Sequence, residues 1–139
     1  MSKLENLLNE IQNCRLCPIM DENIEHEIPL INIKPKPNAK YIFIGRDPSP
    51  NSAKIVGERG GNSVFINEIF SIVDNANIKD DDIYITDMCK CHWRTSAGNS
   101  PYPGTESREK LIPKKYAETC INAWLIKEIE ILKPRIIVS

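Results

Sequence analysis

The sequence contains 139 residues, of which 41% are hydrophobic and 27% are charged, and these values suit a single domain of residues 1–139 with a modest core. The formal net charge of -1 excludes a strongly basic field over the whole chain, so any nucleic-acid contact would need local groups of Lys and Arg. No apolar run approaches the roughly 20 residues of a membrane span, which predicts a soluble, cytoplasmic protein without membrane contact.

The first predicted element is an amphipathic helix over residues 3–13, with Ser2 as its N-cap. Its apolar positions recur at helical spacing and comprise Leu4, Leu7, Leu8 and Ile11. The helix leads directly to Cys14. Between residues 22 and 38 three prolines interrupt a mixed polar stretch, which predicts a loop with at most a short strand at residues 28–33.

Two apolar runs then predict parallel strands joined by a helix. Residues 41–45 (YIFIG) form a continuous apolar run, as expected for a strand buried on both faces, and residues 81–87 (DDIYITD) form the second strand. The stripe between them consists of Val64, Ile66, Ile69, Phe70 and Val73. This alternation predicts a βαβ unit whose ligand-binding loops follow the carboxyl ends of the strands.

The last predicted elements are a long helix and a third strand. Pro113 is placed to begin a helix that runs through Lys133, and Pro134 ends it. Its inward-facing residues would be Ile121, Trp124, Leu125, Ile129 and Leu132. Residues 135–139 (RIIVS) are expected to form a third buried strand. The predicted fold class is α/β, with a central parallel sheet between two layers of helices.

The five cysteines favour metal ligation over disulfides, because reducing compartments keep thiols free and an odd count leaves one unpaired. Cys14 and Cys17 form a CxxC pair whose thiolates can converge on one centre. Cys91 follows the second strand and Cys120 lies in the last helix, so the fold could gather four thiolates. Such a set suits a [4Fe–4S] cluster or a zinc ion. Cys89 competes with Cys91 as the third ligand, and Cys89 and Cys120 could instead be small buried hydrophobic residues.

Five segments, in order, resemble the thermophile-type uracil-DNA glycosylases that carry an iron–sulfur cluster. They are CRLCP at 14–18, YIFIGRDP at 41–48, VGERGG at 56–61, DIYITDMCKC at 82–91, and Cys120 with the helix and strand of 123–139. The resemblance implies that the partner is DNA and that the reaction is hydrolysis of the N-glycosidic bond of a flipped base. It also implies a cluster held by Cys14, Cys17, Cys91 and Cys120.

The same resemblance implies the residues of a base-release site. The loop that begins at Gly45 and Arg46 would border the base, and Asp47 would activate water. The thermophile-type pattern has a Glu-Ala-Pro-Gly run here, whereas GRDP is similar to the GQDP loop of other uracil-DNA glycosylases. Asp47 could instead cap its own turn before Pro48. Ile55 stands where relatives stack an aromatic ring on the base, so base binding should be weaker or less selective.

Asp87 stands where the family usually has an Asn that reads the flipped base. An amide can donate to uracil O4 and accept from N3–H, whereas an ionised carboxylate can only accept, which suits the amino group of cytosine. The sequence therefore predicts a base preference shifted away from uracil. The alternative is that Asp87 is a solvated residue at a strand end in a protein that does not read bases.

Two further departures affect DNA contact and completeness. The long stretch between Cys91 and Cys120 contains Trp93 and Arg94, which could stack on bases and bind phosphate, or belong to a surface insertion. The family's second catalytic loop, a His-Pro-Ser-like motif, has no counterpart. The last strand and helix of the fold would then be missing, and the protein would be a monomer or be completed by a second chain. The rival prediction is a non-catalytic module, bearing a cluster or zinc, that binds DNA or a partner protein.

Overall fold

The computed structural model describes residues 2–25, 30–48, 56–59, 63–91 and 112–139. The elements are α1 (Lys3–Gln12), α2 (Ile19–Glu25), β1 (Tyr41–Gly45), α3 (Val64–Asn75), the 3₁₀ turn η1 (Asp80–Asp82), β2 (Ile83–Asp87), α4 (Lys114–Cys120), the π-helical turn η3 (Ile121–Leu125), α5 (Ile126–Leu132) and β3 (Ile136–Val138). In the described ranges, we find no helix with the length and apolar character needed to cross a membrane.

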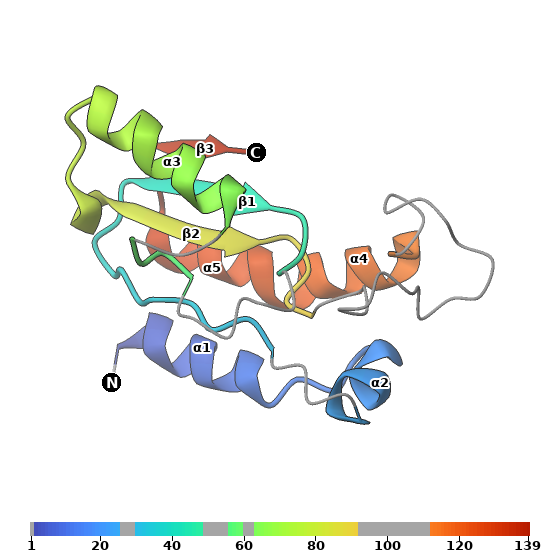
Figure 1. Cartoon of the computed structure of the whole chain (residues 1–139). Coiled ribbons are helices and arrows are strands. Elements are labelled where there is room, and N and C mark those ends of the chain that lie inside the picture. The colour runs from blue at the N-terminus through green and yellow to red at the C-terminus, as the bar shows by residue number, and fades with distance from the viewer. Residues whose placement is uncertain (1, 26–29, 49–55, 60–62, 92–111) are drawn as a thin grey trace.

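The three strands form one parallel sheet in the order β2-β1-β3. Tyr41 is in register with Ile83 and Ile136, and Gly45 is in register with Asp87. Because β2 and β3 flank β1 on opposite sides, right-handed crossovers place α3 and α5 on opposite faces of the sheet, as Figure 1 shows. The predicted α/β class with a central parallel sheet between helices is therefore confirmed.

The first helix and the helix between the two first strands form as predicted. In α1 the Ser2 hydroxyl accepts from the Glu5 amide while the Glu5 carboxylate accepts from the Ser2 amide, a capping box that satisfies both donors. In α3 the Ser63 hydroxyl caps the first turn by accepting from the Ile66 amide. The buried faces consist of Leu4, Leu7 and Ile11 in α1, and Ile69, Phe70 and Val73 in α3.

The predicted long helix is present but is not uniformly α-helical. Its N-cap is Pro113, and its C-cap is Lys133, which adopts the left-handed conformation with φ 47° directly before Pro134. The turn η3 lies between α4 and α5. A π turn takes one extra residue per hydrogen-bonded ring, and such turns occur often at functional sites. It follows Cys120 directly and sets the rotation of α5 relative to that cysteine.

The structure adds one element that was not predicted, limits a second and corrects a third. The helix α2 was not predicted; it buries Ile19 and Met20. Where the sequence predicts a loop with at most a short strand at 28–33, residues 30–33 form a single bridge, between Ile33 and Val56, and residues 28 and 29 lie outside the described ranges. The third strand β3 is not buried, since its side chains are 41–51% exposed. It is an edge strand, and the described part of the chain contains no strand on its outer side.

The buried apolar residues divide into two clusters. The larger cluster contains buried side chains of β1 and β2 and the inner faces of α1 and α3. The smaller cluster is built around sulfur-containing side chains, namely Cys17, Met20, Cys89, Cys91 and Cys120, together with Ile19 and Leu30. Trp124 packs against both clusters. The molecule therefore has a separate cysteine-rich core at the carboxyl ends of β1 and β2, next to α2 and α4.

Candidate functional site

The chain segments that follow β1 and β2 remain hydrogen-bonded to each other beyond the strands. The Met88 amide donates to the Gly45 carbonyl at 2.8 Å, and the Cys89 amide donates to the Arg46 carbonyl at 2.9 Å. These bonds continue the parallel ladder into the loops. They bring the loop that carries Asp47 alongside the end of β2.

Asp87, the last residue of β2, is packed over Gly45. Asp87 as a whole is 7% exposed. A Cβ atom built on Gly45 would lie only 2.2 Å from Asp87 Oδ1 and 2.9 Å from Phe65 Cε1. Glycine at position 45 therefore provides the space that the Asp87 carboxyl group occupies. This geometry excludes the alternative of a solvated Asp87.

Asp47 is the second buried carboxyl group at this end of the sheet. Its side chain is 1% exposed, and the Arg46 guanidinium donates from Nε to Asp47 Oδ1 at 2.9 Å. Burial raises the pKa of Asp87 to about 7; Lys90 opposes this rise, while the carboxylates of Asp47 and Glu128 add to it. Two neighbouring carboxyl groups thus lie in different environments, one beside a guanidinium and one that resists ionisation.

Behind Asp87 lies a fully buried polar network centred on Lys90. The Lys90 ammonium donates to the Thr86 hydroxyl at 2.7 Å and to the main-chain carbonyl of Asp87 at 2.5 Å. It also forms an ion pair with Glu128, and both side chains are 0% exposed. The Tyr84 hydroxyl donates to the other carboxylate oxygen of Glu128. Burial, followed by the charge of Glu128, raises the pKa of Tyr84. The network fixes the end of β2 to α5.

All five cysteines are buried thiols. Burial, with smaller contributions from the charges of Cys120 and Cys14, raises the pKa of Cys17 to about 11. Burial also raises the pKa of Cys91, and here Cys120, Cys17 and Cys14 all contribute. The structure therefore brings together Cys14, Cys17, Cys91 and Cys120, which act on one another electrostatically although they come from segments that are far apart in the chain.

Cys89, the fifth cysteine, is placed differently. It shares a side-chain hydrogen bond with Cys120, a contact that lowers the pKa of Cys120 to about 7 and raises that of Cys89. The other groups that act on Cys89 are Asp47 and Cys91. Cys89 thus lies between the carboxylate site and Cys120, whereas Cys91 interacts with both members of the CxxC pair. This arrangement favours Cys91 over Cys89 as the partner of Cys14, Cys17 and Cys120.

Nitrogen and sulfur groups contact three of the cysteine sulfurs. The Trp124 indole N–H donates to Cys14 Sγ at 3.3 Å, and the Lys90 amide donates to Cys120 Sγ at 3.3 Å. Cys91 Sγ lies 3.3 Å from Met20 Sδ. Amide and indole donors directed at thiolates are typical of iron–sulfur ligation. Within the described ranges, no three His, Cys, Asp or Glu side chains are grouped closely enough to hold one metal ion.

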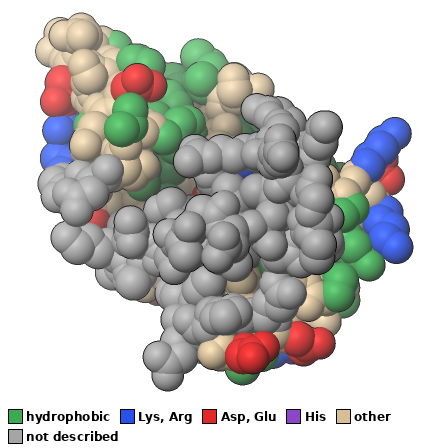
Figure 2. Space-filling view, turned by 45° about the vertical axis from the view of Figure 1, so that its right-hand side comes forward, with side chains coloured by type: hydrophobic (Ala, Val, Ile, Leu, Met, Phe, Trp, Pro, Cys, Tyr) green, Lys and Arg blue, Asp and Glu red, His purple; other side chains and the backbone are tan. Residues whose placement is uncertain are grey.

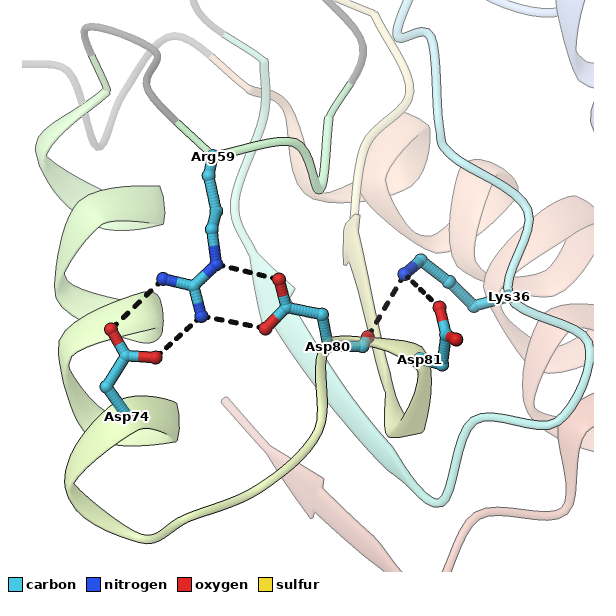
Figure 3. Close-up of polar contacts among 5 residues, drawn as sticks. All are labelled: Lys36, Arg59, Asp74, Asp80 and Asp81. Atoms are coloured by element: carbon cyan, nitrogen blue, oxygen red, sulfur yellow. Dashed lines mark hydrogen bonds and ion pairs between the residues drawn. The ribbon is translucent and has the colours of Figure 1, made fainter.

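Arg59, the last described residue before the gap at 60–62, is held by two carboxylates, as Figure 3 shows. Its guanidinium makes paired hydrogen bonds to the carboxylates of Asp74, at 2.6 and 3.0 Å, and of Asp80, at 2.7 Å each. It also lies 4.4 Å from the centre of the Phe70 ring. Nearby, Lys36 donates to the Asp80 carbonyl at 3.1 Å. These contacts fix Arg59 to the end of α3 and to η1.

Some predicted site residues are not described by the structure, and some residues of the observed site were not predicted from the sequence. Ile55, Trp93 and Arg94 lie outside the described residues. Conversely, the sequence analysis missed Glu128, and it predicted Trp124 as an inward-facing residue without its contact to Cys14. A signal for Glu128 exists, because it shares a helical face with Leu125 and Leu132 at spacings of three and four residues. A charged residue on a buried stripe needs a buried partner, and Lys90 is that partner.

Basic side chains do not gather in one place on the face seen in Figure 2. Among the described residues visible there, Lys and Arg side chains lie at opposite sides of the view. This distribution agrees with the net charge of -1.

A comparison with protein-family models identifies the chain. Residues 33–139 match the model of the uracil DNA glycosylase superfamily. The match covers well over half of the chain and includes the whole sheet, Asp47, Asp87 and the cysteines from Cys89 onward. It does not extend to Cys14 and Cys17. The parallel sheet, the two buried carboxyl groups at its carboxyl end and this match agree, and the chain belongs to the uracil DNA glycosylase superfamily.

Proposed function

We propose that the protein is a DNA glycosylase that hydrolyses the N-glycosidic bond of a flipped uracil or cytosine-type base during DNA repair. Membership in the superfamily supports a glycosylase-like activity on DNA. The observation that carries the proposal is the pair of buried carboxyl groups, Asp47 and Asp87, on hydrogen-bonded segments at the ends of β1 and β2. Ligands of open α/β sheets bind at these strand ends.

The two carboxyl groups have separate roles in this proposal. Rupture of the glycosidic bond builds positive charge on the sugar and negative charge on the departing base. Asp47, oriented by Arg46, positions the attacking water and stabilises the sugar cation. Asp87 contacts the Watson–Crick edge of the base. Flipping the nucleotide costs a few kcal/mol. In this proposal, that cost is offset by contacts to the base from Gly45, Arg46 and the segment containing Ile55.

We also infer that Cys14, Cys17, Cys91 and Cys120 hold a [4Fe–4S] cluster. The support is chemical: the four groups are buried thiols that act on one another, and two N–H donors are directed at their sulfurs. The alternative occupant of the same four thiolates is a single zinc ion, with Zn–S distances of about 2.3 Å. A bound cluster would cross-link the segment after α1 to the end of β2 and to α4.

A base-release assay tests the proposed activity. Oligonucleotides with one uracil, one cytosine or one modified cytosine are incubated with the protein, and the free base and the abasic site are both quantified. We expect release from at least one of them by the wild-type chain, and none by Asp47→Asn at equal DNA occupancy. Failure of the wild-type protein to release any base, or equal release by Asp47→Asn, would contradict the proposal.

The second candidate is a non-catalytic module that binds DNA or a partner protein on the same scaffold. The observation in its favour is that the Asp47 carboxylate, the proposed water-activating group, is buried and already bonded to the Arg46 guanidinium. The same assay separates the two candidates. If the protein is such a module, the wild-type protein and the Asp47→Asn variant should bind DNA with equal affinity, and neither should release a base.

A further inference from the structure

The environment of Asp87 combines burial with nearby negative charge. Its carboxyl group fills the space over Gly45, at a residue exposure of 7%. The titratable groups that act on it come from three elements. They are Asp47 from the loop after β1, Lys90 from the segment after β2, and Glu128 from α5.

The one cation in this set is already engaged. The Lys90 ammonium is ion-paired with Glu128 and bonds to the Thr86 hydroxyl and to the main-chain carbonyl of Asp87. The Arg46 guanidinium bonds to Asp47. An ionised Asp87 would therefore add a third buried carboxylate to a site that already contains those of Asp47 and Glu128.

We propose that Asp87 reads the base as a neutral carboxylic acid, so that this site accepts uracil at and below neutral pH and loses it, relative to cytosine, as the acid ionises. This inference rests on the proposed function. It also changes the expectation drawn from the sequence, in which a permanently ionised Asp87 would reject uracil. The substrate class thereby includes imide bases as well as cytosine-type bases.

The hydrogen-bonding pattern of the neutral acid explains why uracil fits. The acid O–H can donate to uracil O4 while the acid carbonyl accepts from N3–H, the same pair of bonds that an Asn amide would make. With cytosine, the acid can donate to N3 and accept from the amino group. The carboxylate can still accept from the cytosine amino group, but it repels uracil O4. Ionisation therefore penalises uracil more than cytosine.

The direction of the pH effect follows from the raised pKa. With the pKa of Asp87 at about 7, the acid is mostly neutral below pH 7 and mostly ionised above it. The neutral fraction falls about tenfold for each pH unit above the midpoint. Uracil affinity that depends on this proton should fall by the same factor.

The protonation state itself can be observed by ¹³C NMR of the aspartate side-chain carboxyl carbons. The Asp87 resonance is assigned as the one lost in Asp87→Asn, and Asp81→Asn, which removes an exposed carboxyl group (95%), serves as the matched control. We expect a titration midpoint near neutral pH for Asp87. A midpoint near the ordinary aspartate value of about 4 would overturn the inference.

Base reading is tested by binding rather than by turnover. Single-stranded oligonucleotides with one 2′-fluorinated deoxyuridine or deoxycytidine, which resist glycosidic cleavage, are titrated onto the wild-type protein between pH 5.5 and 8.5. We expect the affinity ratio of uracil to cytosine to fall about tenfold for each pH unit above the midpoint. In Asp87→Asn the ratio should favour uracil and stay constant, since an amide does not titrate in this range.

The outcomes separate this inference from the proposed function. A ratio that is independent of pH in the wild-type protein, or that changes equally in Asp87→Asn, would overturn the inference even if base release is observed. A pH-dependent ratio in a protein that releases no base would support the inference and contradict the glycosylase proposal. Asp81→Asn should behave as the wild-type protein does in every arm.

Discussion

At the scale of single residues, the identity of position 45 is explained by its neighbour. Gly45 and Asp87 are in register on adjacent strands, and the carboxyl group of Asp87 occupies the volume that a side chain at position 45 would need. The requirement is for close approach rather than for an unusual backbone conformation. The glycine at position 45 and the acid at the end of β2 therefore depend on each other, because the carboxyl group needs the space that the glycine leaves.

Gly45→Ala should destabilise the protein by about 1–3 kcal/mol, because the added Cβ forces the Asp87 carboxyl group or the Phe65 ring to move. Urea denaturation measures the change. The matched control is the same substitution in an Asp87→Ala background, where the space is free of the carboxyl group. The cost should be smaller there, and equal costs in both backgrounds would show that the Asp87 contact is not responsible.

At the scale of elements, the end of β2 is held to α5 by the buried pair of Lys90 and Glu128. Removing one member, as in Glu128→Gln or Lys90→Met, leaves the other charge buried and uncompensated. We expect a loss of about 3–5 kcal/mol in the free energy of unfolding, measured by urea denaturation. The double variant Lys90→Met with Glu128→Leu should cost less than either single change. Single changes that cost under about 1 kcal/mol would contradict this account of the network.

The helical run from α4 to α5 presents Trp124 to the sulfur of Cys14. In the cluster-loaded protein, Trp124→Phe should lower the reduction potential, because loss of the N–H donor to Cys14 Sγ destabilises the more negative, reduced cluster. Protein-film voltammetry measures the potential. Ile129→Val, a conservative change on the same helix that packs against the larger core, should leave it unchanged. An unaltered potential in Trp124→Phe would exclude this role for the indole.

Much of the element pattern could be predicted from the sequence, for identifiable reasons. The run YIFIG and the stripe that includes Ile69, Phe70 and Val73 have the periods of a buried strand and an amphipathic helix, and both elements form there. The edge exposure of β3 could not be predicted, because strand order depends on contacts between distant segments. The helix α2 is short, and its seven residues, IMDENIE, carry only a weak apolar period.

The site shows the same division. Asp47 and Asp87 follow apolar runs, so their position at strand ends could be predicted. Their burial could not, since it depends on the loop bonds between Met88 and Gly45. The grouping of Lys90 with Glu128 depends on the rotation of α5 after the π turn, which the amino-acid pattern does not specify.

At the scale of the whole molecule, the two cores have different compositions and different expected sources of stability. The larger core is built from aliphatic and aromatic side chains, and the smaller from the cysteines with Met20 and its neighbours. Burial, together with the neighbouring cysteines, raises the pKa of Cys17 and of Cys91, so these two thiols are poorly arranged for ionisation without a cation. A cluster bound to them would stabilise the smaller core and join α2 and α4 to the sheet.

Iron analysis and absorption spectroscopy of anaerobically purified protein test this account of the smaller core. We expect four iron and four sulfide per chain, with absorbance near 400 nm. The absorbance distinguishes the cluster from zinc, because zinc is d¹⁰ and colourless. Cys17→Ser and Cys120→Ser should lose the iron, whereas Cys89→Ser should retain it. If Cys91→Ser retains the iron and Cys89→Ser loses it, Cys89 rather than Cys91 is the third ligand. A colourless protein that contains zinc would contradict the cluster.

In the proposed reaction, the carboxylate of Asp47 activates water against a base held at the ends of β1 and β2. Single-turnover release of the preferred base, measured with saturating enzyme for the wild-type protein and Asp47→Asn, tests it most directly. We predict a rate at least 10²-fold lower in the variant, the lower end of the effect of a positioned general base, with unchanged DNA affinity. Equal rates in the two proteins would contradict the claim.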